Sequence, residues 1–89
     1  MNEDNKKYLR SLFQKAKYFE NKFKYASGRQ IVLKSLLRET LGYCNALVHC
    51  GHITRENANK IYYIIFSKWL KAFEESLEEQ NCPTIGKGE

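Results

Sequence analysis

The sequence predicts an all-α protein, a three-helix up-down-up antiparallel bundle with a short flexible C-terminal tail. In three successive segments apolar residues recur every three or four positions, the spacing that places them on one face of a helix. The connections between the segments are short, and short connections make successive helices antiparallel. The expected division is a single helical bundle domain over residues 1–82 and a tail over residues 83–89.

The first predicted helix covers residues 5–26. Asn2 or Asp4 can cap its start, because the side-chain oxygen of either residue can accept a hydrogen bond from an unpaired backbone N–H. Ser27 is expected to end it, and Ser27 with Gln30 has the spacing of a capping box for the next helix. The apolar face is expected to consist of Leu9, Leu12, Ala16, Phe19, Phe23 and Ala26.

The second predicted helix runs from Arg29 to about Cys50. Gly42 falls on its outer face, and Gly51 can adopt the left-handed conformation that ends a helix. The residues expected on its buried face are Leu33, Leu36, Leu37, Thr40, Leu41, Cys44, Leu47 and Val48.

The third predicted helix runs from Arg55 to about Gln80. Thr54 is placed to cap it, and the sequence at 81–83 is expected to stop it with a proline. Residues 61–66 also favour a strand, but the helical period continues beyond them, so we expect a helix. Its apolar positions are Ala58, Ile61, Tyr62, Ile65, Phe66, Trp69, Ala72, Phe73 and Leu77.

The net charge of +5 is concentrated in the first part of the chain. Residues 1–40 hold ten Lys or Arg against four Asp or Glu, whereas residues 41–89 hold five against six. This asymmetry indicates an acidic partner such as nucleic acid, although a solvated face on a bundle would give the same pattern. In an up-down-up bundle the acidic cluster at 74–79 should lie at the same end as Lys22, Lys24 and Arg29.

The sequence indicates a cytoplasmic protein. It lacks the pattern of a signal peptide, and its longest apolar run, residues 61–66, is too short to span a bilayer. Three cysteines, Cys44, Cys50 and Cys82, form an odd number and fit a reducing compartment, so we expect no disulfide. We expect no membrane partner.

Metal, cofactor and catalytic sites are not expected. Cys44, His49, Cys50 and His52 lie close in sequence, but they fall on different faces of a helix, and their spacing does not seed a tetrahedral zinc site. The same cysteines and histidines do not form a nucleophile and base with a third orienting group. Phosphate-binding glycine motifs are also absent. We therefore predict that the protein is not an enzyme.

The first helix carries a candidate surface for nucleic acid or an acidic partner. Lysines with tyrosines between them can hold a phosphate backbone and stack a base. An alternative is that the tyrosines rest on a neighbouring helix and the lysines keep the protein soluble. The candidate residues are Lys6, Arg10, Lys17, Tyr18, Lys24 and Tyr25.

The third helix carries the second candidate surface. Its apolar arc is wider than a bundle of this size can bury, because it is widened by Tyr63, Ile64, Phe66, Leu70 and Leu77. Tyr63 and Leu70 point away from the central face, and Tyr63, Phe66 and Leu70 are the candidate partner-binding residues. Large apolar residues that stay grouped on a surface usually mark a contact with another chain. The alternatives are that the first helix wraps over them or that the helix boundary differs.

Together these features predict a small non-enzymatic binding protein, an inhibitor, adaptor or accessory subunit that engages a protein or nucleoprotein. Apolar residues of the third helix would provide burial, and lysines of the first helix would provide steering. Its size and shape also fit the small proteins that phages and mobile elements encode. The alternative is direct, largely sequence-independent binding of nucleic acid, and a homo-oligomeric scaffold is a third hypothesis.

Overall fold

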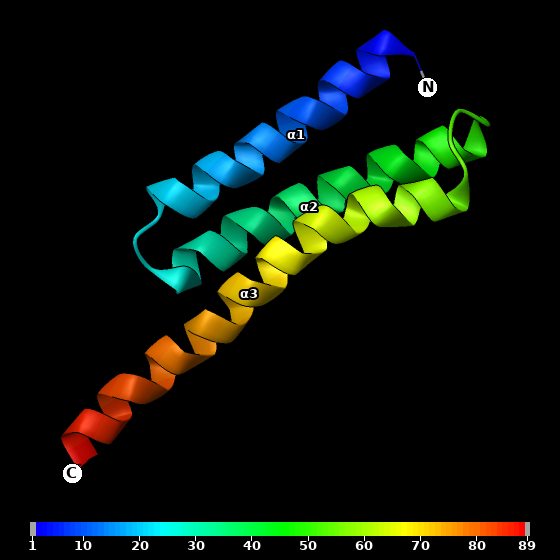
Figure 1. Cartoon of the computed structure of the whole chain (residues 1–89). Coiled ribbons are helices and arrows are strands. Elements are labelled where there is room, and N and C mark those ends of the chain that lie inside the picture. Colours follow the sequence, from blue (N-terminus) through cyan, green and yellow to red (C-terminus); the bar gives the residue numbers. More distant parts are fainter. Residues whose placement is uncertain (1, 89) are drawn as a thin grey trace.

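The computed structural model describes the backbone of residues 2–88 and the side chains of residues 2–79. It contains α1 (Glu3–Lys22), α2 (Ala26–His49) and α3 (Arg55–Gly88). The three helices run antiparallel in succession, and α3 projects beyond the α1–α2 turn (Figure 1), which confirms the predicted fold class. The helix end predicted at about Gln80, with a stop at 81–83, is wrong for the backbone, because α3 continues to Gly88. The side chains of the predicted tail lie outside the described residues.

The start of α1 is capped as predicted. The Asn2 side chain accepts a hydrogen bond from the Asn5 backbone N–H at 2.8 Å. Glu3 and Asp4 occupy the first turn, where carboxylates interact favourably with the positive end of the helix dipole. Of the two predicted caps, Asn2 is therefore the one used.

The predicted boundary between the first two helices is wrong. α1 already ends at Lys22, a short turn at 23–25 follows, and Ala26 begins α2 rather than ending α1. Ser27 lies inside α2 and does not form the capping box with Gln30.

A carboxylate from α3 replaces the expected cap of α2. Glu79 accepts hydrogen bonds from the backbone N–H groups of Ala26 at 2.7 Å and Ser27 at 3.2 Å. These donors belong to the first turn of α2, where backbone N–H groups lack partners within the helix. A residue more than fifty positions away in sequence thus fixes where α2 begins.

The α2–α3 turn agrees with the prediction. Gly51 has a φ of 78°, and the His52 N–H donates to the Leu47 carbonyl at 2.8 Å, as in a Schellman motif. Thr54 then caps α3, because its Oγ1 accepts a hydrogen bond from the Asn57 N–H at 3.1 Å. Residues 61–66 are helical, so the strand alternative is wrong.

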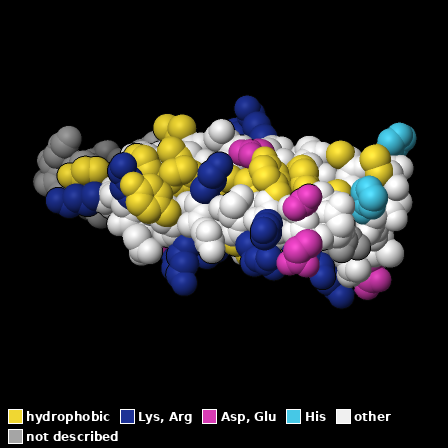
Figure 2. All heavy atoms as spheres, turned by 90° about the horizontal axis from the view of Figure 1, so that it is seen from above, with side chains coloured by type: hydrophobic (Ala, Val, Ile, Leu, Met, Phe, Trp, Pro, Cys, Tyr) yellow, Lys and Arg dark blue, Asp and Glu magenta, His cyan; other side chains and the backbone are white. Residues whose placement is uncertain are grey.

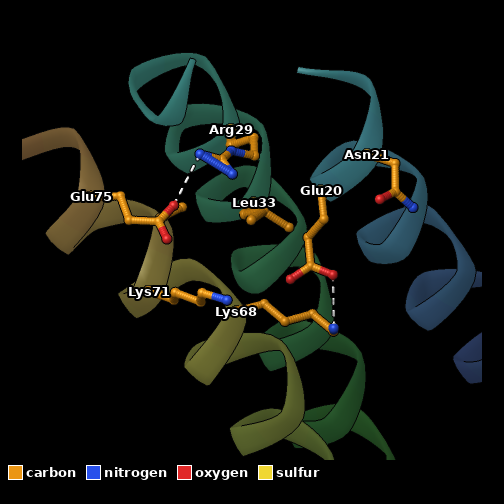
Figure 3. A pocket seen from close by; sticks show the side chains of 8 residues that line it. Glu20, Asn21, Arg29, Leu33, Lys68, Lys71 and Glu75 are labelled. Atoms are coloured by element: carbon orange, nitrogen blue, oxygen red, sulfur yellow. Dashed lines mark hydrogen bonds and ion pairs between the residues drawn. The ribbon is translucent and has the colours of Figure 1, made fainter. Parts of the chain in front are cut away.

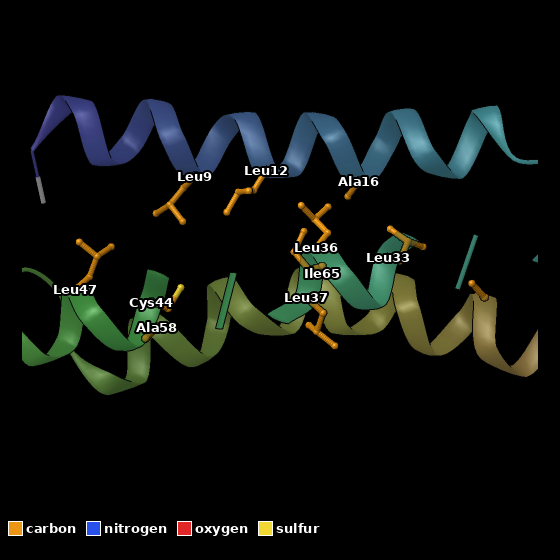
Figure 4. Packing of buried hydrophobic residues seen from close by; sticks show 11 residues of the cluster. Leu9, Leu12, Ala16, Leu33, Leu36, Leu37, Cys44, Leu47, Ala58 and Ile65 are labelled. Carbon is orange, nitrogen blue, oxygen red and sulfur yellow. The ribbon is translucent and has the colours of Figure 1, made fainter. Parts of the chain in front are cut away.

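The core lies where the three helices meet (Figure 4). Leu12, Leu33 and Ile65 contribute one fully buried side chain from each helix. Thr40 is also fully buried, and its hydroxyl donates to the Leu36 carbonyl at 2.8 Å. Leu41 was expected in the core but is 42% exposed, because it lies about 100° around α2 from Thr40.

The helices pack unequally. α2 and α3 lie side by side over much of their length, and the small residues Ala58 and Ala72 are buried between them. α1 packs mainly on α2 through Leu9, Leu12 and Ala16 and makes few contacts with α3. The α2–α3 hairpin is therefore the main structural unit, and α1 covers one side of it.

Candidate interaction surface

Most of the exposed apolar residues of α3 form a continuous row, and Ile64, which is 44% exposed, lies outside it. We define the α3 strip as Tyr63, Phe66, Leu70, Phe73 and Leu77, which lie within an arc of about 80° on the helix. Four of them are exposed, Tyr63 by 63%, Leu70 by 36%, Phe73 by 37% and Leu77 by 44%. Three of the five strip residues, Tyr63, Phe66 and Leu70, were predicted as partner-binding residues. The described part of the chain therefore does not enclose the strip, contrary to the alternative that α1 wraps over it.

Phe66 connects the strip to the core. It is half-buried, packs against the core cluster, and its ring centroid lies 6.0 Å from Tyr63 and 5.8 Å from Trp69. The Trp69 indole N–H in turn donates to Gln30 of α2 at 3.2 Å. The exposed edge of Phe66 is thus held in a defined position, which lowers the entropy cost of binding a partner.

The inward position predicted for Phe73 is wrong, because its side chain is 37% exposed, whereas Leu77, which also belonged to the wide predicted arc, is 44% exposed as that arc indicated. α2 packs against the side of α3 that carries Ile65 and Ala72. Phe73 and Leu77 both lie toward the end of α3 that meets the first turn of α2, where Glu79 contacts Ala26, so less of α2 is present there to cover them. The strip is consequently longer than the sequence indicated.

The predicted basic surface is split between α1 and the turn that follows it. Lys6, Arg10 and Lys17 are exposed on one outer face of α1, and Arg10 lies 3.4 Å from Glu3. Lys24 and Tyr25 were expected on the same helix, but α1 ends at Lys22, so both lie in the turn. The six residues therefore do not form one straight row.

Two exposed tyrosines are accompanied by lysines. Tyr18 is 55% exposed and Tyr25 is 62% exposed, so neither rests on a neighbouring helix as the alternative required. The Lys22 ammonium lies 5.4 Å from the Tyr18 ring centroid, and that of Lys24 lies 5.6 Å from Tyr25. On the face shown in Figure 2, the largest group of hydrophobic side chains lies toward the end opposite the histidines, and basic side chains are spread along the face.

The α3 strip and α1 lie on opposite sides of α3. Lys68 of α3 contacts Glu20 of α1 at 2.9 Å, so its side of α3 faces α1. Lys68 lies about 160° around the helix from both Phe66 and Leu70. The sequence could not reveal this arrangement, because helical spacing does not say which side of a helix its neighbours occupy.

A polar pocket of about 270 Å³ lies where the three helices meet, and the sequence did not predict it (Figure 3). Two ion pairs cross it, Arg29 with Glu75 at 3.0 Å and Lys68 with Glu20 at 2.9 Å. Lys71 extends into it from α3. The first pair confirms that the acidic cluster of α3 meets the basic residues at this end. Glu75 and Glu20 are already paired with Arg29 and Lys68, so these side chains mainly link the three helices to one another.

An apolar hollow of about 410 Å³ lies between α1 and α2. Tyr18 and Phe19 line it from α1, and Val32 and Leu36 line it from α2. It adjoins the Lys22–Tyr18 contact, so a flat apolar group could rest beside Tyr18.

The two described cysteines differ in burial. Burial raises the pKa of the Cys44 thiol, which makes its nucleophilic thiolate form less accessible. Cys44 is buried and Cys50 is exposed, and neither is bonded within the described residues. Among residues 2–79, no three His, Cys, Asp or Glu side chains are placed to hold a metal ion. The helices as described also lack an apolar stretch long enough to cross a membrane.

No known protein family, curated protein or solved structure shows a significant match to this chain.

Proposed function

We propose that this chain is a small non-enzymatic binding protein that engages a protein or nucleoprotein partner through the α3 strip. The observation that carries the proposal is the exposure of Tyr63, Leu70, Phe73 and Leu77 in one row beside the anchored Phe66. Grouped aromatic and large aliphatic side chains are the residues that supply most binding energy at protein interfaces.

The basic surface of α1 adds a second contact to this proposal. Because the strip and α1 lie on opposite sides of α3, one compact partner cannot readily touch both. The arrangement fits an adaptor, which contacts one macromolecule with its apolar side and an acidic one with its basic side, better than an inhibitor that covers a single site. Charges such as Lys6 and Lys17 would then steer the acidic partner and set its register.

Affinity capture from the source cell, with and without nuclease, tests the role of the strip. Leu70→Glu places a charge in the middle of the strip, and Ile31→Glu is a matched control on α2, since Ile31 is 63% exposed and lies outside the strip. We expect a protein that survives nuclease treatment with the original chain and the control but is lost with Leu70→Glu. Capture that is insensitive to Leu70→Glu, or that vanishes entirely after nuclease treatment, would contradict the proposal.

A second candidate function is direct binding of nucleic acid, which the exposure of Tyr18 and Tyr25 beside Lys22 and Lys24 favours. Stacking of a base on an exposed tyrosine contributes about 1 to 3 kcal/mol, and lysines contact phosphates. Single-stranded DNA and RNA should then bind with an affinity that falls steeply with salt. Tyr18→Ala should weaken binding at every salt concentration, and Lys17→Ala should also reduce the salt slope. Absence of binding at about 50 mM salt would exclude this function.

A further inference from the structure

We propose that the α3 strip binds a second copy of this chain, with the two α3 helices antiparallel and related by a two-fold axis near Ser67. The inference rests on the proposed function, because it names the partner of the same strip. It follows from the spacing of the strip, from the charges beside it and from the side of α3 that α1 leaves open.

The strip has the spacing of a helix–helix seam. Its residues, at positions 63, 66, 70, 73 and 77, are separated alternately by three and four positions, which is the heptad pattern of paired helices. From Tyr63 to Leu77 the seam is about 21 Å long. A helix of similar length is therefore a better fit to it than a loop or a small ligand.

The strip is complementary to itself in the antiparallel orientation. With the axis level with Ser67 and Lys68, Tyr63 packs against Phe73 of the second copy, and Phe66 packs against Leu70 of the second copy. The two-fold axis makes each contact occur twice, because Phe73 of the first copy also packs against Tyr63 of the second, and Leu70 of the first copy against Phe66 of the second. Four apolar layers result, and each combines an aromatic ring with a second large apolar side chain. Leu77 lies beyond these layers, level with Asn59 of the second copy.

The charges beside the strip select the antiparallel orientation. Lys60, Ser67 and Glu74 follow one another at intervals of seven along its flank, on the side away from α2. In the antiparallel pair, Lys60 faces Glu74 of the second copy, Glu74 faces Lys60, and the small Ser67 residues meet at the axis. In a parallel pair, each of these residues would lie level with its own copy, and the lysine would not meet the glutamate.

Both charged residues are available for this contact. The ion pair of Lys60 with Glu56 is long, at 4.0 Å, and both of its side chains are largely exposed, so it holds Lys60 weakly. Glu74 is exposed and takes part in no ion pair among the residues whose side chains are described. Exposed pairs contribute about 0 to 1 kcal/mol each, so they orient the helices while the apolar layers supply most of the affinity.

The exposed area predicts a reversible dimer. Five side chains of about 200 Å² each, exposed by about two-fifths, offer roughly 400 Å² per copy. This area is about half of what each partner contributes to a stable interface. We therefore expect monomer and dimer to exchange, with the dimer increasing as concentration rises. Each α1 lies away from the strip, so the dimer would present two basic surfaces on its outer sides.

Sedimentation equilibrium from about 5 to about 500 µM tests the dimer. The mass of the original chain should rise from 10.5 kDa toward twice that value. Leu70→Glu should remain monomeric, and Ile31→Glu should associate like the original chain. A chain that stays monomeric throughout overturns the inference, whereas the capture experiment still decides the proposed function. Circular dichroism of every variant verifies that the helices are retained.

Charge exchange tests the orientation. Lys60→Glu alone and Glu74→Lys alone should each weaken self-association about tenfold, because both symmetric pairs become repulsive. An equimolar mixture of the two variants should restore the dimer, since the mixed dimer again pairs opposite charges at both sites. The double variant K60E/E74K should also associate like the original chain. Failure of the mixture to restore association, or unchanged association of the single variants, overturns the antiparallel arrangement.

Discussion

The two sides of the α2–α3 hairpin differ in whether another helix covers them. On one side α1 covers the hairpin with Leu9, Leu12 and Ala16, and polar contacts hold its edges, among them the Lys68–Glu20 ion pair at 2.9 Å. On the other side the strip of larger side chains stays exposed. Stability should therefore depend on the covered side, while the open side should tolerate substitution and serve binding.

The largest expected effect is the difference in stability between two leucine variants, one on the covered side of the hairpin and one on the open side. Leu12→Ala on the covered side should lower the free energy of unfolding by about 2 to 5 kcal/mol, because Leu12 is fully buried and its loss leaves a cavity. A chain of this length has a total stability of about 4 to 13 kcal/mol, so this loss is a large fraction of the total. Urea unfolding followed by circular dichroism measures the change.

Leu70→Ala on the open side is the matched variant. Leucine and alanine have similar helix propensities, and Leu70 is partly in water, so we expect a loss of no more than about 1 kcal/mol. This measurement belongs at low protein concentration, where self-association does not add to stability. Equal losses for the two leucine variants would show that the open side is also part of the core.

A second prediction concerns the cap that α3 provides for α2. Glu79→Ala should cost about 1 to 2 kcal/mol, because the N–H groups of Ala26 and Ser27 lose their acceptor. Glu79→Gln should cost less, since its amide oxygen can still accept one hydrogen bond. Glu78→Ala is the control, because Glu78 is exposed, and it should change the free energy of unfolding by less than about 0.5 kcal/mol. Similar losses for Glu78→Ala and Glu79→Ala would argue against the cap.

Local signals in the sequence were sufficient for the helices and for most of the core. The period of three to four residues identified Leu12, Leu33 and Ile65, all fully buried, and the turn residues Gly51 and Thr54 fixed the α2–α3 connection. These features depend on residues a few positions apart, which is the range that a sequence pattern reports.

Features that depend on distant residues were not predictable in this way. Glu79 lies more than fifty positions from the helix that it caps, so Ser27 was the nearer but incorrect choice. Phe73 has the spacing of a core residue, yet 37% of its surface is exposed. The position of α1 opposite the strip likewise depends on how the helices pack, which periodicity leaves open.

A third prediction extends the comparison to the solvent-facing side of α2. Gly42 lies there, and a Cβ added to it would meet no atom within 4 Å. Gly42→Ala should therefore raise the free energy of unfolding by about 0.5 to 1 kcal/mol through helix propensity alone. Gly51→Ala is the contrasting control, because the φ of 78° at Gly51 disfavours any residue with a Cβ, and that variant should be less stable. A loss of stability in Gly42→Ala would show that this side also makes a close contact.

The smallest expected effect concerns the polar edge of the covered side. The Tyr8 hydroxyl donates to the Glu39 carboxylate, and this hydrogen bond, followed by burial, raises the pKa of Tyr8 above its ordinary value of 10.0. A raised tyrosine pKa means that the fold favours the neutral phenol. Its contribution to stability is therefore complete below pH 10.0 and is lost as the pH rises through the higher value in the folded state.

Unfolding of the original chain and of Tyr8→Phe at pH 8 and pH 11 tests this contact. At pH 8 the variant should be less stable by about 0.5 to 1 kcal/mol, because it lacks a partly exposed hydrogen bond. At pH 11 the difference should shrink, because the phenol of the unfolded chain is then ionised while the hydrogen bond in the folded chain requires the neutral phenol. Tyr18→Phe is the control, because Tyr18 is exposed and its difference should stay near zero at both values. A difference for Tyr8→Phe that does not change with pH would mean that apolar packing, and not this hydrogen bond, holds the edge of α1 on the covered side.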